Sequence, residues 1–242
     1  MYTLRFETRF TYDFVCRFLA QPCHRILEVG CGAGELARHL SDRGFQVTAI
    51  DRDEESIAAA RSLGVNARIA KWPEFSDSGF DVVLFTRSLH HIHPLRKAVE
   101  AAAGCLRSGG RIIVEDFDYE SADERTLRWF ASVSRVVAAS GLLVERHDLI
   151  DGILATDGSL AAWRKHHEHD LSSAIEIAAT LETVFGDVVT ENAAYYFRYL
   201  AKAMGDLNQR DAVTEALAQQ EGELISQGAI TALGRRFVAT RG

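Results

Sequence analysis

Three glycines at alternating positions are the feature of this sequence that most restricts its fold. They lie in Gly30-Cys-Gly-Ala-Gly34, between an apolar segment at 25–29 and a segment of helical pattern at 35–43. Because glycine has no Cβ, such a turn lets the backbone approach a ligand that larger residues would exclude. The segment predicts a strand, a ligand-binding turn and a helix, in that order.

The pattern of a strand followed by a helix is repeated along the first half of the chain. Further strands are predicted at 45–50, 65–69, 80–85 and 111–116, and further helices at 53–63 and 94–106. Strands that alternate with helices form a parallel sheet with right-handed crossovers, which binds ligands at the carboxyl ends of its strands. We therefore expect a doubly wound, Rossmann-like α/β fold.

The alternation stops near residue 118. Helical patterns follow at 122–140 and 171–184, then two short strand patterns at 188–189 and 195–200 that could pair as a hairpin, and a mostly helical 206–238. The two extra strands predict a seven-stranded, mostly parallel sheet with a helical substrate lobe inserted after strand five. We expect one domain over 1–242, with an N-terminal helix in 1–20 and a substrate-covering helical insertion at 118–180.

Composition excludes several classes of protein. The 27 basic and 34 acidic residues give a net charge of −7, which disfavours nucleic acid as a partner. The four cysteines have no metal-binding spacing and no signal peptide precedes them, so we expect reduced thiols and a cytoplasmic location. The longest apolar runs are too short to cross a bilayer, so no membrane partner is expected. We expect a monomer or a homodimer.

An acidic residue after the second strand indicates what the glycine turn binds. Asp51 ends this strand, where a carboxylate can accept hydrogen bonds from both hydroxyls of a ribose. A dinucleotide fingerprint would have glycine where this chain has Glu35, and the charge of Glu35 would oppose a pyrophosphate. A nucleoside without phosphates fits both observations, and NAD fits poorly.

Four segments resemble those of class I S-adenosylmethionine (SAM) methyltransferases. They are Ile26-Leu-Glu-Val-Gly-Cys-Gly-Ala-Gly34, Val47-Thr-Ala-Ile-Asp51, the segment 80–92 with its Leu-His-His, and the segment 106–114 with its Ser-Gly-Gly. Together they cover roughly residues 25 to 116 in the order and spacing of that family. The resemblance implies SAM as cofactor and S-adenosylhomocysteine as product.

The resemblance also implies which residues hold the cofactor. The expected set is Glu28, Gly30, Cys31, Gly32, Gly34, Asp51, Arg52, Lys71, Trp72, Thr86 and Arg87. The chain departs from the family after strand three, where Ala70-Lys-Trp72 has no carboxylate for the adenine amino group. Trp72 could stack on the adenine or pack in the core.

Methyl transfer requires few catalytic residues, because the main task is to align the acceptor and exclude water. His90 and His91 follow strand four and are candidate bases for a hydroxyl acceptor, and Asp116 at the end of strand five could orient a histidine. Each could instead have a structural role. Arg87 could also bind a substrate carboxylate.

A polar cluster at His166-His-Glu-His-Asp170, with His147-Asp148 before it, offers imidazole and carboxylate groups. It lacks a recognised ligand spacing, so no metal site is expected.

The sequence predicts transfer of a methyl group from SAM to an oxygen or nitrogen atom of a small-molecule acceptor. A methyltransferase acting on RNA or protein would favour a basic stripe or an Asn/Asp-Pro-Pro-aromatic motif after strand four, where this chain has Thr86-Arg-Ser-Leu89. Two further classes also fit part of the pattern, a SAM-binding protein without chemistry and a nicotinamide oxidoreductase.

Overall fold

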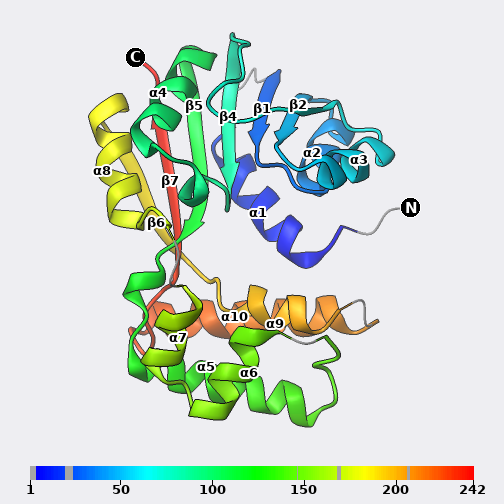
Figure 1. The fold of residues 1–242 in the computed structure, drawn as a ribbon, viewed down its shortest axis with the longest axis vertical. Coiled ribbons are helices and arrows are strands. Elements are labelled where there is room, and N and C mark those ends of the chain that lie inside the picture. Colours follow the sequence, from blue (N-terminus) through cyan, green and yellow to red (C-terminus); the bar gives the residue numbers. More distant parts are fainter. Residues whose placement is uncertain (1–3, 20–23, 146, 168–169, 206–207) are drawn as a thin grey trace. The chain divides into compact units, whose positions relative to one another are not determined.

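Seven strands form one sheet in a computed structural model that describes residues 4–19, 24–145, 147–167, 170–205 and 208–242 (Figure 1). The order across the sheet is β3-β2-β1-β4-β5-β7-β6. The strands are β1 (Arg25–Val29), β2 (Gln46–Asp51), β3 (Ala67–Ile69), β4 (Phe80–Thr86), β5 (Leu106–Phe117), β6 (Val188–Ala193) and β7 (Gly234–Thr240). The predicted α/β fold with a mostly parallel, seven-stranded sheet is confirmed.

The first five strands are parallel to one another, and β7 is antiparallel to its neighbour β5. β1 pairs in parallel with β2 and β4, β2 with β3, and β4 with β5. Backbone hydrogen bonds join Gly109 to Arg241 and Asp118 to Leu233. Residue numbers therefore rise along β5 while they fall along β7, as in an antiparallel pair.

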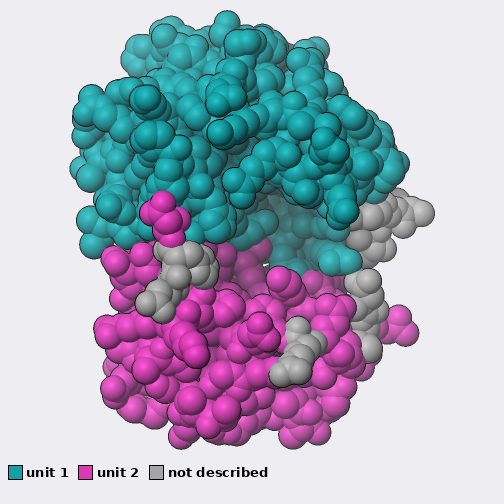
Figure 2. Space-filling model, viewed as in Figure 1, with its two compact units in different colours: residues 1–116, 171–191, 236–242 teal, residues 117–170, 192–235 magenta. Residues whose placement is uncertain are grey.

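Two compact units make up the chain and are coloured separately in Figure 2. Unit 1 comprises residues 1–116, 171–191 and 236–242, and unit 2 comprises 117–170 and 192–235.

Unit 1 has helices on both faces of its strands. The helices are α1 (Phe6–Arg17), α2 (Glu35–Asp42), α3 (Glu54–Ser62), α4 (Leu95–Cys105) and α8 (Ala174–Phe185), with the short 3-10 helix η1 (Leu89–His91). α1, α2 and α3 pack in one apolar cluster, and α4 and α8 in a second. Along β1, Ile26 belongs to the first cluster while Leu27 and Val29 belong to the second, so the strand is buried on both faces.

Unit 2 is built mainly from helices. They are α5 (Glu124–Ala139), α6 (Asp148–Thr156), α7 (Leu160–His166), α9 (Phe197–Ala203) and α10 (Arg210–Ser226), with the 3-10 helix η2 (Tyr119–Ser121). Aromatic rings fill its interior, including the fully buried Trp163, Phe130 and Tyr196. Trp163 and Tyr196 lie 5.6 Å apart between ring centroids.

Two predictions about the last third of the chain were wrong. Residues 195–200 begin helix α9 instead of forming a strand, because the Glu221 carboxylate accepts hydrogen bonds from the backbone N–H groups of Tyr195, Tyr196 and Phe197. A carboxylate on exposed N–H groups of this kind stabilises a helix start. The mostly helical 206–238 ends instead in strand β7, which supplies the seventh strand.

The helical part also differs in extent from the expected insertion at 118–180. Residues 171–180 belong to unit 1, and α9 and α10 join the earlier helices in unit 2.

Candidate functional site

The glycine turn after β1 adopts a backbone that side chains would prevent. Gly30 has a φ of +74°, and a Cβ there would lie 2.5 Å from the Cβ of Ser88. Gly34 has a φ of +79°, and its Cβ would lie 2.6 Å from that of Ala60. Gly32 also has a positive φ, yet a Cβ there would meet nothing within 4 Å. Two of the glycines therefore allow close packing, and Gly32 faces open space.

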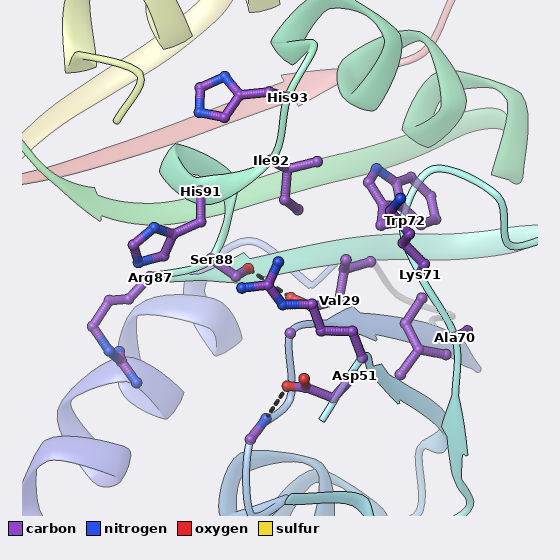
Figure 3. Close-up of a pocket in the computed structure, with 14 residues that line it drawn as sticks. Val29, Asp51, Ala70, Lys71, Trp72, Arg87, Ser88, His91, Ile92 and His93 are labelled. Carbon is purple, nitrogen blue, oxygen red and sulfur yellow. Dashed lines mark hydrogen bonds between the residues drawn. The ribbon is translucent and has the colours of Figure 1, made fainter. Parts of the chain in front are cut away.

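The open space is a pocket of about 310 Å³ at the carboxyl ends of β1, β2 and β4 (Figure 3). It is lined by Val29, Gly30, Gly32, Ile50, Asp51, Arg52, Ala70, Lys71, Trp72, Arg87, Ser88, His91, Ile92 and His93. All of these residues belong to unit 1. The pocket lies where a doubly wound sheet binds its ligand.

Asp51 joins the glycine turn to the start of the next helix. Its Oδ2 atom accepts a hydrogen bond from the Gly32 N–H at 2.9 Å, and its Oδ1 atom accepts one from the Asp53 N–H at 3.0 Å. Each carboxylate oxygen has a second acceptor position. The carboxylate is therefore held in place by backbone and can still accept hydrogen bonds from a ligand.

The structure brings eight of the predicted site residues together at this pocket. They are Gly30, Gly32, Asp51, Arg52, Lys71, Trp72, Arg87 and His91. Glu28, Cys31, Gly34, Thr86, His90 and Asp116 are not among the lining residues.

The side chains of Glu28, just before the turn, and Cys31, within it, are buried. The Glu28 side chain is only 2 % exposed, and Thr86 donates a hydrogen bond of 3.4 Å to its Oε1 atom. Burial raises the pKa of Glu28 to about 8, with the Arg87 charge acting in the opposite direction. Burial also raises the pKa of the Cys31 thiol to about 12, so Cys31 is a neutral core residue.

Trp72 packs in the core and also borders the pocket. Its ring is 6 % exposed, its Nε1–H donates to the Ala98 carbonyl at 3.0 Å, and it meets Phe85 edge to face. Trp72 is therefore fixed in orientation, with little of its surface available to a ligand.

Arg87 belongs to a charge network around the buried Glu115. Its Nη1 atom donates to Glu115 at 3.0 Å and to Thr11 of α1 at 3.2 Å. Arg236 of β7 donates to the other oxygen of Glu115 from Nε and Nη2, at 3.0 and 2.7 Å. Arg236 is itself 8 % exposed and lies over the rings of Phe10 and Phe14.

The two histidines after β4 have different environments. His90 is 4 % exposed, and its Nδ1 atom lies 2.6 Å from Oδ1 of the fully buried Asp116. His91 is exposed and lines the pocket, with its ring centroid 4.0 Å from that of His90. Asp116 thus orients His90, and His91 is the histidine of this pair that a bound ligand can reach.

Six lining residues were absent from the predicted site: Val29, Ile50, Ala70, Ser88, Ile92 and His93. Each is close in sequence to a predicted residue. Their positions near the carboxyl ends of the strands were the signal from which they could have been predicted. Ser88 also donates a 2.6 Å hydrogen bond to the Val29 carbonyl, which ties the turn after β4 to the end of β1.

The histidine cluster of unit 2 is described only in part, because Glu168 and His169 lie outside the described residues. His167 contacts the Trp163 carbonyl and the Tyr199 hydroxyl through its two ring nitrogens, at 2.9 and 3.1 Å. Among the described residues, no group of three or more His, Cys, Asp or Glu side chains is arranged to hold a metal ion.

Comparisons with known proteins agree with this architecture. The profile of a methyltransferase domain family matches residues 4–149. Trans-aconitate 2-methyltransferase of Mycolicibacterium gilvum is 34% identical over 130 residues, which are 51% of this chain and 50% of that enzyme. Ubiquinone biosynthesis O-methyltransferase of Xylella fastidiosa is 32% identical over 174 residues, which are 66% of this chain and 68% of that enzyme.

The fold is shared with solved structures of low sequence identity. A SAM-dependent methyltransferase from Archaeoglobus fulgidus has a TM-score of 0.56 at 16% identity, over 97% of this chain and 96% of that one. The chain spans about half the length of the first curated relatives that it matches. The family profile covers more than half of the chain, including the glycine turn and Asp51, and the chain therefore belongs to the methyltransferase domain family.

Proposed function

We propose that this protein transfers a methyl group from SAM to an oxygen or nitrogen atom of a small molecule. The observation that carries the proposal is the position of Asp51, whose carboxylate is fixed by Gly32 and Asp53 at the edge of the pocket. An oriented carboxylate can accept hydrogen bonds from both ribose hydroxyls of a nucleoside. The methyltransferase family and the two relatives named above support the reaction.

The residues present fit this cofactor. A Cβ at Gly32 would project into open space, so the glycine leaves room that a ligand can fill. Backbone groups of the turn offer donors without charge, and the aliphatic side chains of Val29, Ile50 and Ile92 provide apolar walls. A pocket of about 310 Å³ suits a ligand of nucleoside size.

When bound, SAM supplies an activated methyl group on a sulfonium sulfur. The protein binds the nucleoside through Asp51 and the glycine turn, and His91 accepts the proton of a hydroxyl acceptor. His90 is too buried to contact the acceptor, so we assign it and Asp116 to the positioning of the segment after β4. The His90 backbone also contributes, because its N–H donates to Asp116 at 3.3 Å and its carbonyl accepts from Ser172.

Two further parts of the proposal concern the whole chain. We propose that the helical segment 118–180 selects the acceptor within a single functional domain and that the protein acts as a monomer or homodimer. A cytoplasmic location is supported by Cys16, Cys31 and Cys105, which are free thiols. In the described part of the chain, no helix is long and apolar enough to cross a membrane.

Calorimetric titration with SAM, S-adenosylhomocysteine and NAD tests the cofactor. Asp51→Ala should weaken binding of SAM by about tenfold or more, because a bidentate contact to a charged group is lost. Asp51→Asn should have a smaller effect, and Asp42→Ala, in an exposed pair with Arg38, should have none. Binding of NAD in place of SAM would overturn the proposal.

The same titrations separate binding from chemistry. His91→Ala should bind SAM as the wild type does, because His91 is assigned to the acceptor and not to the nucleoside. Transfer of a labelled methyl group to a hydroxyl acceptor should fall by about 100-fold or more in this variant. Tight SAM binding without transfer to any acceptor in a broad panel would favour the SAM-binding protein without chemistry.

A further inference from the structure

Unit 2 contains a pocket of its own, with a volume of about 640 Å³. Its walls come from the 3-10 helix η2 and from helix α7, which is labelled in Figure 1. The lining residues are Tyr119, Glu120, Leu160, Ala161, Arg164 and Lys165. None of them lines the pocket at the glycine turn. A cavity of this size accommodates a small molecule.

One side of α7 lines this pocket. Leu160 and Arg164 are four residues apart in the sequence, and so are Ala161 and Lys165. Residues at this spacing are neighbours on a helix surface, so the four side chains share one side of α7. Trp163 is instead fully buried in unit 2. The helix is therefore anchored by Trp163 and presents a different side to the pocket.

Contacts with the interior of unit 2 fix the wall that η2 provides. The Trp163 Nε1–H donates to the Tyr119 carbonyl at 2.8 Å, which joins α7 to η2. The Tyr119 ring stacks on His167, with ring centroids 5.9 Å apart and an angle of 8° between the planes. His167 is held in turn by the Trp163 carbonyl and the Tyr199 hydroxyl. The pocket is thus formed before a ligand binds, which lowers the entropic cost of binding.

The protein leaves the two positive charges of this pocket without ion-pair partners. Arg164 and Lys165 are exposed, and neither side chain pairs with an acidic group in the described part of the chain. The exposed Glu120 also has no ion-pair partner among the described residues, whereas Arg128 of α5 pairs with Glu124. Two positive side chains and one negative side chain leave an excess of one positive charge, which favours an anionic ligand.

The residue types around these charges indicate which anion fits. The guanidinium of Arg164 can bind a carboxylate with two parallel hydrogen bonds, and the ammonium of Lys165 adds a second positive charge beside it. Tyr119 and Leu160 are half-buried and offer an aromatic and an aliphatic surface. A ligand that uses both features has a planar apolar body and a carboxylate.

We propose that the pocket of unit 2 binds an aromatic carboxylate. Arg164 and Lys165 hold the carboxylate group, and Tyr119 and Leu160 contact the ring. The inference goes beyond the proposed function, because it concerns a second ligand and depends on residues of unit 2 alone.

Titration of the full chain with 4-fluorobenzoate, followed by fluorine NMR, tests the proposal. The uncharged 4-fluorobenzamide has the same ring and should bind at least about tenfold more weakly. Arg164→Met should lower the affinity for 4-fluorobenzoate about fivefold to tenfold and change that for the amide by less than about twofold. Glu120→Gln should raise the affinity for 4-fluorobenzoate about twofold to threefold, because a repelling charge is removed. Damage to the fold would lower both affinities in either variant.

Two control variants show where the carboxylate binds. Arg128→Met removes a positive charge from α5 of unit 2, outside the pocket lining, and should leave the affinity for 4-fluorobenzoate unchanged. Lys71→Met removes one from the pocket at the glycine turn and should also have no effect. Loss of affinity in Lys71→Met but not in Arg164→Met would overturn the proposal. So would equal binding of the carboxylate and the amide, or a wild type that binds neither.

Discussion

Glu28 is a carboxyl group in the interior of unit 1, two residues before the glycine turn. One oxygen accepts a weak hydrogen bond of 3.4 Å from Thr86, and the backbone N–H of Ala37 also favours the charged form of the carboxyl group. Burial raises its pKa to about 8, so the folded protein holds a proton there at neutral pH. Glu28 is therefore an uncharged group behind the pocket, and Asp51 is the acidic side chain that lines it.

The protonation of Glu28 makes the free energy of unfolding depend on pH. The group titrates at 4.5 in its ordinary state and at about 8 in the folded protein. Between these values the folded state binds more protons than the unfolded state, so stability falls as the pH rises. We expect urea denaturation to show a loss of about 1–3 kcal/mol between pH 5 and pH 8 that is missing in Glu28→Gln.

The other titrating groups contribute equally to the pH dependence of the wild type and of Glu28→Gln. The difference between the two proteins is therefore the contribution of Glu28. An equal pH dependence in wild type and Glu28→Gln would show that Glu28 is ionised when folded.

Single residues near the motifs could be predicted, but their partners could not. Gly30, Gly32 and Asp51 are identified by local spacing, and the structure places all three at the pocket. One partner of Glu115 is Arg236, 121 residues later, and Arg236 reaches Glu115 only because β7 pairs with β5. A charge pair across strands so distant in sequence leaves no local pattern.

At the scale of elements, helix α9 shows how a distant side chain overrides a local pattern. Residues 195–200 are rich in aromatic residues, which favour strands, yet three consecutive N–H groups at the helix start bind Glu221 of α10. Burial raises the pKa of Glu221 to about 7, while the three N–H donors favour its charged form. The carboxylate replaces the backbone partners that the first turn of a helix lacks.

Removal of this carboxylate should destabilise the protein strongly. Glu221→Ala leaves three buried N–H groups without acceptors, and we expect a loss of about 2–4 kcal/mol in the free energy of unfolding. Glu221→Gln keeps one acceptor oxygen and should lose less. Urea denaturation measures both.

The control for Glu221 lies slightly further along the same helix. Glu223→Ala changes a glutamate of α10 that makes no contact with the start of α9 in the described hydrogen bonds, and it should alter stability by less than about 0.5 kcal/mol. Similar losses at the two positions would show that Glu221 contributes through the helix alone and not through α9.

The helices and strands in the first half of the chain were predictable because each is specified by its local sequence. The helix at 53–63 begins as expected, with Asp53 accepting a hydrogen bond from the Ser56 N–H at 2.8 Å. Strand β7 was missed because it ends a long helical segment and is stabilised by pairing with β5 and β6. Strands that join the sheet late in the sequence depend on that pairing more than on their own propensity.

At the scale of the whole molecule, the chain passes from one unit to the other after residues 116, 170, 191 and 235. Three of the strands, β5, β6 and β7, contain residues of both units. Loss of these strands in unit 1 would therefore remove part of unit 2 as well. We expect the two units to unfold in one cooperative transition, although each has its own apolar interior.

The tryptophans allow this expectation to be measured. Trp72→Phe leaves Trp129 and Trp163, both in unit 2, as the fluorescent reporters, whereas the proposed cofactor pocket lies in unit 1. S-adenosylhomocysteine at 100 times its dissociation constant for this variant should stabilise the folded state by about 2.7 kcal/mol. If the two units unfold together, the urea midpoint reported by the tryptophans of unit 2 rises by the amount that corresponds to this whole stabilisation. The reason is that a ligand bound to unit 1 then stabilises both units. A urea midpoint that does not change when the ligand is added would show that unit 2 unfolds independently of unit 1. The strands shared by the two units would then not couple their unfolding.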